Sequence, residues 1–342
     1  MEKQIFTSFP AAGGAKLGEL CRELLAEQKK TWPALATAYA GLAGIKTKLH
    51  SCGGYDVCVQ FNPARSVSSG AAVDPRSIKS RPCFLCTRNL PSEQQGILYQ
   101  KEYLILCNPA PIFEKHFTVV HRQHQPQAIA ASMDKLLDMA ADMSPDFVVF
   151  YNGPACGASA PDHLHFQVIP AGLLPLPGAF PEHFRMIRDS SVQVYRSEET
   201  DRAVLVLAGS DQELLLKQFD CLMQAAQKTT CLSGEPMMNV LCSYENGMWR
   251  IMIFFRARHR PDAFYREGEQ RVFISPGTID MAGVVITPRE IDFNRLDGAG
   301  IRSIYAEVSL PEEVVNKIVE QGVATTHAGG KTPCSMRTIP EA

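Results

Sequence analysis

The sequence lacks any strong excess of charge, because 34 basic residues are balanced by 36 acidic ones and the formal net charge is −2. A strongly basic surface, which drives nonspecific binding to nucleic acid, is therefore excluded. No apolar run approaches the ~20 residues needed to span a bilayer. The N-terminal residues also lack the apolar stretch of a secretory signal. We therefore expect a cytoplasmic protein with no nucleic-acid partner and no membrane partner.

The composition is that of a folded chain, since 45% of the residues are hydrophobic and only 20% are charged. A length of 342 residues is long for one domain and sufficient for two. The eleven cysteines are scattered along the chain. In a cytoplasmic protein most of them are expected to be reduced and to serve as ordinary core residues. Only Cys83 and Cys86 stand apart by their spacing.

Apolar periodicity predicts helices and strands in mixed order. Helical spacing predicts helices over residues 16–49, divided at Pro33, and over 128–143, 211–228 and 311–321. Short or alternating apolar runs predict strands over 55–61, 103–107, 117–121, 145–150, 191–195, 203–208, 238–244, 248–255 and 281–287. Residues 62–70 and 71–81 are predicted to be loops. Hairpins with intervening helices favour an α+β fold with antiparallel sheets over a doubly wound one.

The most informative stretch is an alternating segment in which His163, His165 and Gln167 are separated by apolar residues. Successive side chains of a strand point to opposite faces, so these three polar side chains are predicted to share one face. The segment follows a loop at 152–160 that is rich in Gly, Ala and Ser. Such a loop lets backbone N–H groups approach phosphate without side-chain obstruction. The pattern therefore favours a phosphate-handling site.

Cys83-x-x-Cys86 is a modest zinc signal by itself. His124 and His163 could complete a Cys2His2 set, which suits a closed tetrahedral zinc site. His121 competes with His124 as a ligand, because it lies only three residues away. The alternative is that the two cysteines are neighbours by chance in a cysteine-rich chain.

His165 is the candidate nucleophile, because an imidazole that attacks phosphorus divides one displacement into two easier ones. Its other ring nitrogen then needs a hydrogen-bond acceptor that fixes the tautomer. Gln167 can donate to a phosphoryl oxygen during transfer. The alternative is that both histidines are half-buried polar residues on a sheet, or that both are metal ligands.

These motifs resemble the transferase branch of the histidine-triad superfamily. Asn108-Pro-Ala-Pro111, then Phe117-Thr-Val-Val and His124, is similar to the strand that precedes that superfamily's histidine motif. His163-Leu-His165-Phe-Gln167 is similar to the His-x-His-x-Gln signature of the branch. The branch includes galactose-1-phosphate uridylyltransferases, diadenosine tetraphosphate phosphorylases and GDP-hexose phosphorylases such as GDP-L-galactose phosphorylase, and the string His-Leu-His-Phe-Gln looks most similar to the last of these.

The resemblance implies a role for each matching residue. His165 matches the nucleotidylated histidine and Gln167 the glutamine that holds the transferred phosphoryl group. The remaining matches are to zinc ligands (Cys83, Cys86, His124, His163) and to nucleotide- or phosphate-binding residues (Arg65, Asn152, Gly157, Ser159). Asp162 is an extra residue relative to the uridylyltransferase pattern, which favours the GDP-hexose branch.

The resemblance also implies a histidine-triad-like fold of two related halves, with antiparallel sheets and flanking helices. We expect an N-terminal helical segment (1–50), a catalytic domain (51–185) and a degenerate second domain without the His-x-His motif (186–342). The basic cluster Arg256, Arg258, His259 and Arg260 could bind phosphate or sugar there, but we interpret it as a solvated strand end.

The expected function is nucleotidyl transfer from a nucleoside diphosphate sugar, with GDP-hexose favoured, to phosphate or a sugar 1-phosphate through a covalent nucleotidyl-histidine. One alternative is diadenosine tetraphosphate phosphorylase. Another is a nucleotide-binding protein without turnover, against which the intact pair of His165 and Gln167 argues. A homodimer is implied by the resemblance alone.

Overall fold

A large mixed sheet forms the centre of the molecule. The computed structural model describes residues 4–324 except 12, 53 and 199–200, so the C-terminal tail with Cys334 lies outside the described residues. The sheet has eleven strands in spatial order, namely β1 (Ile5–Phe9), β4 (Gly96–Tyr99), β5 (Tyr103–Cys107), β6 (Phe117–His121), β8 (His165–Pro170), β7 (Phe147–Asn152), β12 (Met238–Glu245), β13 (Met248–Phe255), β11 (Val204–Gly209), β10 (Gln193–Ser197) and β9 (Phe184–Arg188). Its pairings are antiparallel except that of β1 with β4.

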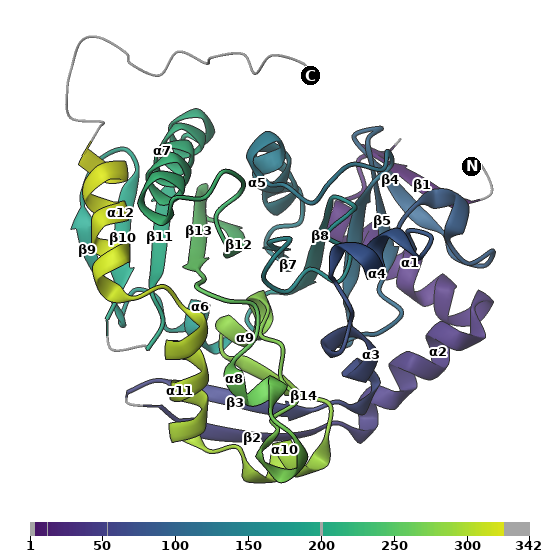
Figure 1. Cartoon of the computed structure of the whole chain (residues 1–342). Coiled ribbons are helices and arrows are strands. Elements are labelled where there is room, and N and C mark those ends of the chain that lie inside the picture. The colour runs from purple at the N-terminus through teal and green to yellow at the C-terminus, as the bar shows by residue number, and fades with distance from the viewer. Residues whose placement is uncertain (1–3, 12, 53, 199–200, 325–342) are drawn as a thin grey trace.

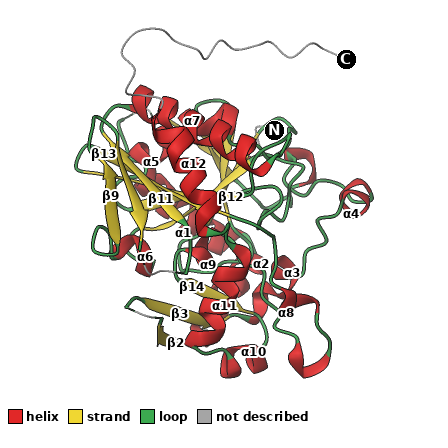
Figure 2. Cartoon of the chain, turned by 60° about the vertical axis from the view of Figure 1, so that its left-hand side comes forward, coloured by secondary structure: helices red, strands yellow, loops and turns green. Residues whose placement is uncertain are grey.

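A second, three-stranded sheet packs against the large one. It has the order β14 (Val284–Thr287), β3 (Asp56–Phe61) and β2 (Lys46–Ser51), with β14 parallel to β3 and β2 antiparallel to it. In Figure 1, the strands of this small sheet lie below those of the large sheet, and the turned view in Figure 2 also separates them. Apolar residues from both sheets form a shared core, including Val57, Val59, Phe150, Ile169 and Val284.

Helices cover both sides of the large sheet. The longer ones that share a core with it are α1 (Leu17–Thr31), α2 (Pro33–Ala40), α5 (Met133–Asp142), α7 (Gln212–Thr230) and α12 (Glu312–Ala324). On the side of the small sheet lie α9 (Thr278–Met281), α10 (Glu290–Arg295) and α11 (Gly298–Val308). Shorter helices are α3 (Ser66–Ser69), α4 (Pro75–Lys79), α6 (Pro175–Gly178) and α8 (Asp262–Tyr265), with 3-10 turns at Gly41–Gly44, Pro63–Arg65, Thr87–Asn89, Ala130–Ser132 and Gly268–Gln270.

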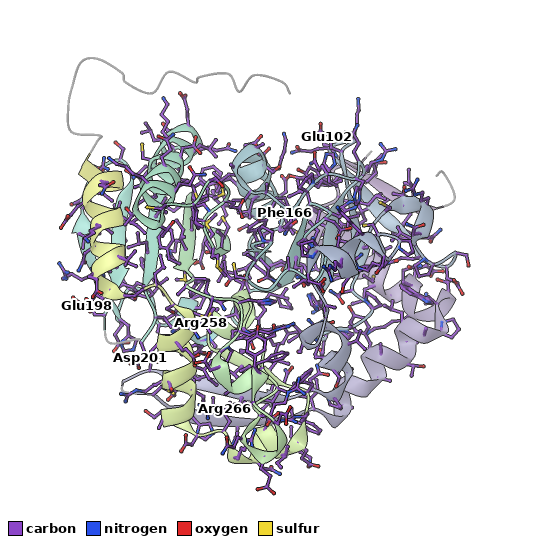
Figure 3. All side chains as sticks on the ribbon, viewed as in Figure 1. Glu102, Phe166, Glu198, Asp201, Arg258 and Arg266 are labelled. Atoms are coloured by element: carbon purple, nitrogen blue, oxygen red, sulfur yellow. The ribbon has the colours of Figure 1, made fainter. Side chains whose placement is uncertain are left out.

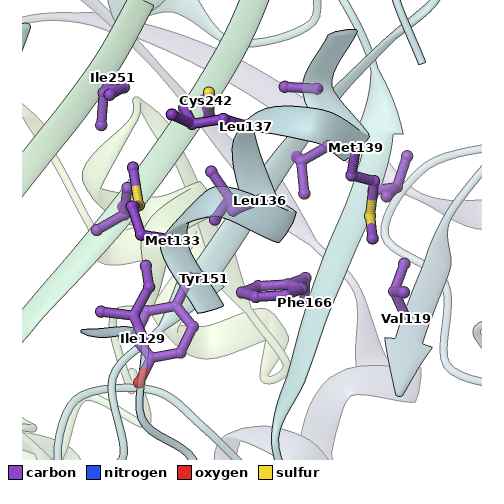
Figure 4. Close-up of a cluster of buried hydrophobic side chains, with 14 of the residues drawn as sticks. Val119, Ile129, Met133, Leu136, Leu137, Met139, Tyr151, Phe166, Cys242 and Ile251 are labelled. Carbon is purple, nitrogen blue, oxygen red and sulfur yellow. The ribbon is translucent and has the colours of Figure 1, made fainter. Parts of the chain in front are cut away.

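Local sequence explains how the helices begin and which face they bury. Asp211 caps α7, where its carboxylate accepts the N–H of Leu214 at 3.0 Å. On α5 the buried residues recur at helical spacing, and Figure 4 shows Leu136 beside Tyr151 and Phe166 of the large sheet. Charged side chains such as Glu102 and Glu198 stand at the periphery in Figure 3.

The α+β fold with largely antiparallel sheets and flanking helices is confirmed, but several local predictions are wrong. Residues 46–49 belong to the strand β2 rather than to a helix, because Lys46–Ser51 pairs with β3. The predicted loops at 62–70 and 71–81 contain the short helices α3 and α4, and Asp74 caps the latter. The strands β1, β4 and β9 and the helix α11 were not predicted; each of the three strands has only four or five residues, too few to show a clear period. The division at residues 50 and 185 stays a prediction.

None of the helices among the described residues is long and apolar enough to cross a membrane.

Candidate functional site

A cavity of about 700 Å³ lies between the large sheet and the layer that contains β14. Its volume falls in the range of small-molecule sites, which is roughly 300–1,000 Å³. Segments far apart in the sequence line it, from the turn after β3 to the strand β14. The structure brings all the predicted catalytic and phosphate-binding residues to its wall, namely Arg65, Asn152, Gly157, Ser159, His165 and Gln167.

The strand β8 presents two faces, as its alternation predicts. Leu164, Phe166 and Val168 point into the helix-covered core. His165 and Gln167 point the other way, into the cavity. His163 lies just before β8, and its ring contacts cysteine sulfur instead. Two residues of one alternating segment therefore face the cavity, while the third faces the candidate metal centre.

His165 is held as a neutral imidazole in one tautomer. Its Nδ1–H donates to the carbonyl of His163 at 2.8 Å, which leaves the Nε2 lone pair available. Burial lowers the pKa of His165 to about 4, so the ring is uncharged at neutral pH. Gln127, which sequence reasoning missed, accepts the His165 N–H at 2.8 Å and donates to the carbonyls of His165 and Asn152 at 3.1 and 2.9 Å. The backbone of His165 and the start of the loop are thus held by one side chain.

Gln167 is oriented by a histidine that sequence analysis also missed. His116 accepts the Ile112 N–H on Nδ1 at 3.3 Å, so its Nε2–H donates to Gln167 Oε1 at 2.8 Å. The amide oxygen is thereby engaged, and the NH2 group remains to donate to a ligand. Burial and the nearby Arg65 lower the pKa of His116 to about 3, which keeps it neutral. Thr118 of β6 pairs with Gln167 and His116 lies two residues earlier, so the strand pairing, which the sequence alone does not reveal, brings the two side chains together.

The loop after β7 is held by hydrogen bonds to the second half of the chain. Asn152 Oδ1 accepts from Asn239 Nδ2 at 2.9 Å and from the N–H and hydroxyl of Thr278 at 2.8 Å each. Gly157 has φ +112°, and a Cβ there would lie 3.0 Å from the Cα of Gly277. Glycine is therefore required at this position for both its backbone angle and its space.

Arg65 brings positive charge to the cavity. Its Nη1 donates to the carbonyl of Ala110 at 2.7 Å. Burial lowers the pKa of Arg65 to about 10, opposed by the carboxylate of Asp280, so the guanidinium remains charged at neutral pH. Its Nε has no hydrogen-bond partner among the described residues. A buried donor in that state indicates a missing acceptor such as a phosphate oxygen.

Cys83, Cys86, His124 and His163 form a cluster, the metal cluster below, whose ligand atoms all lie within 4.8 Å of one another. Nδ1 of His163 lies 3.3 Å from Cys83 Sγ, 3.6 Å from Cys86 Sγ and 3.3 Å from His124 Nδ1, while His124 Nδ1 lies 3.3 Å from Cys86 Sγ. A tetrahedral zinc ion, with Zn–N near 2.05 Å and Zn–S near 2.3 Å, separates such ligand atoms by roughly 3.3 to 3.6 Å. The four residues can therefore hold a metal ion.

The surroundings of the metal cluster show which nitrogen of His163 faces it and that His121 lies outside it. His163 Nε2–H donates to the carbonyl of His121 at 2.7 Å, which leaves Nδ1 free to bind metal. His121 itself is not part of the cluster, so it does not compete with His124. The extra residue Asp162 pairs with Arg81 at 2.9 Å, and Arg81 lies 4.9 Å over the ring of Phe84.

The interpretation of residues 256–260 as a solvated strand end is wrong for three of its four basic residues. Arg256 is only 2% exposed and donates to Asn239 Oδ1 at 2.5 Å and to the carbonyls of Pro276, Val308, Arg258 and His259. His259 and Arg260 line the cavity. Only Arg258 is exposed, and it forms ion pairs with Asp262 and Glu307. The sequence could not distinguish these residues, because tertiary contacts alone decide which of them are buried.

The hydrogen bonds from Arg256 to Asn239, and from Asn239 and Thr278 to Asn152, form a continuous arginine network. All four side chains are buried. The network runs from Arg256, just after β13, through β12 to β7, so it ties the second half of the chain to the loop at 152–160.

Comparison of the sequence with known proteins gives one match to a family model. A family model described as "Domain of unknown function (DUF4922)" matches residues 24–170. No curated protein sequence matches the chain.

Solved structures of yeast Ap4A phosphorylase Apa2 are similar to the chain. The complex with AMP matches with a TM-score of 0.58 and 17% identity, and covers 85% of this chain and 96% of that chain. A further structure of the same enzyme matches with a TM-score of 0.56 and 15% identity, and covers 82% of this chain and 97% of that chain. The complex with Ap4A matches with a TM-score of 0.53 and 16% identity, and also covers 82% of this chain and 97% of that chain. The chain therefore has the fold of these phosphorylases.

Proposed function

We propose that this protein is a nucleotidyltransferase of the phosphorylase type that acts through a covalent nucleotidyl-His165. The observation that carries the proposal is the pairing of two oriented side chains in one cavity. His165 is fixed with its Nε2 lone pair free, and Gln167 is fixed with its NH2 group free. A phosphorus atom between them would meet a nucleophile and a donor that need no rearrangement.

The proposed reaction consists of two displacements at one phosphorus atom. In the first, His165 Nε2 attacks the α-phosphorus of the donor, a P–N bond forms, and the P–O bond to the leaving phosphate breaks. The ring becomes cationic, and the carbonyl of His163 stabilises it through Nδ1–H. In the second, an oxygen of the acceptor phosphate attacks the same phosphorus, and the P–N electron pair returns to Nε2. Neither displacement requires a proton to move, and Gln167 and Arg65 are placed to stabilise the phosphoryl oxygens.

We assign zinc to the metal cluster, because two thiolates and two imidazoles suit a closed tetrahedral zinc site. When bound there, zinc would supply structural support only, since all four positions are taken by protein. Through His163 it would fix the carbonyl that orients His165.

Two donor classes are proposed. GDP-hexose is favoured by the string His163-Leu-His165-Phe-Gln167 and by the extra residue Asp162. Ap4A (diadenosine tetraphosphate) is supported by the fold shared with yeast Ap4A phosphorylase. The acceptor in either case is phosphate, with a sugar 1-phosphate as the further candidate for the sugar donor. A homodimer remains part of the proposal.

Intact mass after incubation with each donor in the absence of acceptor tests the proposal. GDP-hexose, UDP-hexose and Ap4A would add a guanylyl, uridylyl or adenylyl group respectively, each the nucleoside monophosphate less water, so one spectrum identifies both base and mechanism. The adduct should be absent in His165→Ala. A folded protein that forms no adduct and turns over none of these donors would contradict the enzyme proposal and leave nucleotide binding without turnover.

A further inference from the structure

The cavity has a second polar wall that the proposed chemistry at His165 does not use. His259, Arg260, Ser275 and Asp280 contribute to it, and all come from the second half of the chain. Arg260 Nε donates to Ser275 Oγ at 3.0 Å, and the same oxygen lies 3.1 Å from His259 Nε2. These three side chains form a connected group, the Arg260 group below.

Contacts with neighbouring segments hold the Arg260 group in position. Arg260 Nη2 donates to the carbonyls of Ser69 and Ala71 at 3.0 and 3.1 Å, and the guanidinium lies 4.2 Å over the ring of Phe264. Arg256, buried beneath, donates to the carbonyls of His259 and Pro276 on either side of the group. Long side chains held in this way lose little further entropy when they bind a ligand.

The charges around the cavity favour an anion at this wall. Arg65, Arg81 and Arg260 line the cavity, with Arg81 already paired with Asp162, and Asp280 is the one carboxylate among the described lining residues. Both oxygens of Asp280 already accept backbone N–H groups, from Gly277 and Ile286 at 2.9 Å each. His259 is kept neutral, since burial and the neighbouring Arg260 and Arg256 lower its pKa to about 4. Its Nε2 is engaged by Ser275 Oγ, which leaves Nδ1 as the ring nitrogen that can contact a ligand.

The order of bond changes indicates which anion is bound. In a phosphoryl transfer the attacking and leaving groups lie roughly in line through phosphorus. The leaving phosphate of the donor therefore departs from the side opposite His165 Nε2, and the acceptor phosphate must attack from that same side. A single anion subsite would serve both substrates in turn.

We propose that the Arg260 group is this subsite, and that it binds first the leaving phosphate of the donor and then the incoming inorganic phosphate. The inference rests on the proposed function, because it takes His165 as the nucleophile. It assigns the wall of the second half to the acceptor, while β8 and the loop at 152–160 act on the transferred nucleotidyl group.

The test follows the second displacement by itself. Protein carrying the nucleotidyl adduct is isolated, and its loss is followed by intact mass at increasing concentrations of inorganic phosphate. In Arg260→Gln the half-saturating phosphate concentration should rise about tenfold or more, since a charge-assisted hydrogen bond is removed. His259→Gln should give a smaller rise, and Arg260→Lys should lie between Arg260→Gln and the unmodified protein.

Two controls separate phosphate binding from a structural role. Arg258→Gln removes an adjacent arginine that is exposed and ion-paired outside the cavity, so it should change nothing. Hydrolysis of the adduct in the absence of phosphate should be the same in all variants, and each variant should be folded at the temperature of the assay. An unchanged phosphate dependence in Arg260→Gln would overturn the proposal, and so would a parallel increase in hydrolysis.

Calorimetric titration of the free protein with inorganic phosphate distinguishes failure of this inference from failure of the proposed function. Weaker phosphate binding in Arg260→Gln supports the subsite even if no adduct ever forms. If the adduct forms but phosphate binds equally well to Arg260→Gln, the subsite assignment is wrong and the nucleotidyl transfer stands.

Discussion

The cavity is supported on two sides by very different structures. On the side of β8, the metal cluster gathers four ligand atoms from three separate segments. On the side of β12 and β13, the arginine network joins Arg256 to Asn152 by hydrogen bonds through buried Asn239. If the cluster holds a metal ion as proposed, that ion can be removed, whereas the network has no removable part. The two sides of the cavity therefore differ in how they can be tested.

The largest effect is expected from a substitution in the metal cluster. Cys86→Ser should abolish metal binding and lower the free energy of unfolding by more than about 4 kcal/mol, because loss of a structural metal is among the most damaging changes. Metal analysis and denaturant unfolding would measure the two effects. The matched control is Cys231→Ser, since Cys231 is exposed and outside the cluster. Full metal content in Cys86→Ser would contradict the assignment.

Loss of the arginine network should lower the free energy of unfolding slightly less. Arg256→Met removes donors from Asn239 and from several buried carbonyls, and it should destabilise the protein by about 3 kcal/mol. Metal content should stay at the level of the unmodified protein, because the cluster lies on the other side of the cavity. Arg258→Gln is the control and should change stability by no more than about 0.5 kcal/mol. Equal effects of the two substitutions would show that the network is not a support.

The comparison also explains what the sequence could reveal. The metal cluster was predicted because Cys-x-x-Cys and two histidines are a recognisable ligand set, and His165 and Gln167 because strand alternation places them on one face. The arginine network could not be predicted, since Arg256 and Arg258 look alike in the sequence and differ only in tertiary contacts. His116 and Gln127 were missed for the same reason, because a single histidine or glutamine beside a strand carries no spacing signal.

A smaller effect is expected where an orienting contact is lost but both supports remain. His116→Phe keeps an aromatic ring but leaves Gln167 free to turn, so adduct formation should slow by roughly ten- to a hundredfold, somewhat less than the loss of a donor itself. Single-turnover measurements would give the rate. His183→Gln, away from the cavity, should leave it unchanged. A normal rate in His116→Phe would mean that Gln167 is held by something else.

The last prediction concerns the dependence of stability on pH. The pKa of His259 is lowered to about 4 in the folded protein from an ordinary value of 6.5. Between these values the unfolded chain binds a proton that the folded one does not, so stability is full above pH 6.5 and falls as the pH drops towards 4. His259→Gln should therefore lose less stability than the unmodified protein across this window, as measured by denaturant unfolding at each pH. Equal losses would show that His259 does not resist protonation.

The pairing of β7 with β12 has a consequence for any attempt to divide the chain. A fragment that ended at residue 185 would leave β7 as an open edge, with the backbone groups of residues 149–152 that face β12 unpaired. Unprotected edges of this kind associate with other chains and aggregate. The same cut would remove Asn239, Arg256 and the whole Arg260 group from the cavity wall. Truncation would therefore cost solubility and the proposed acceptor site together, so the two halves are best produced as one polypeptide.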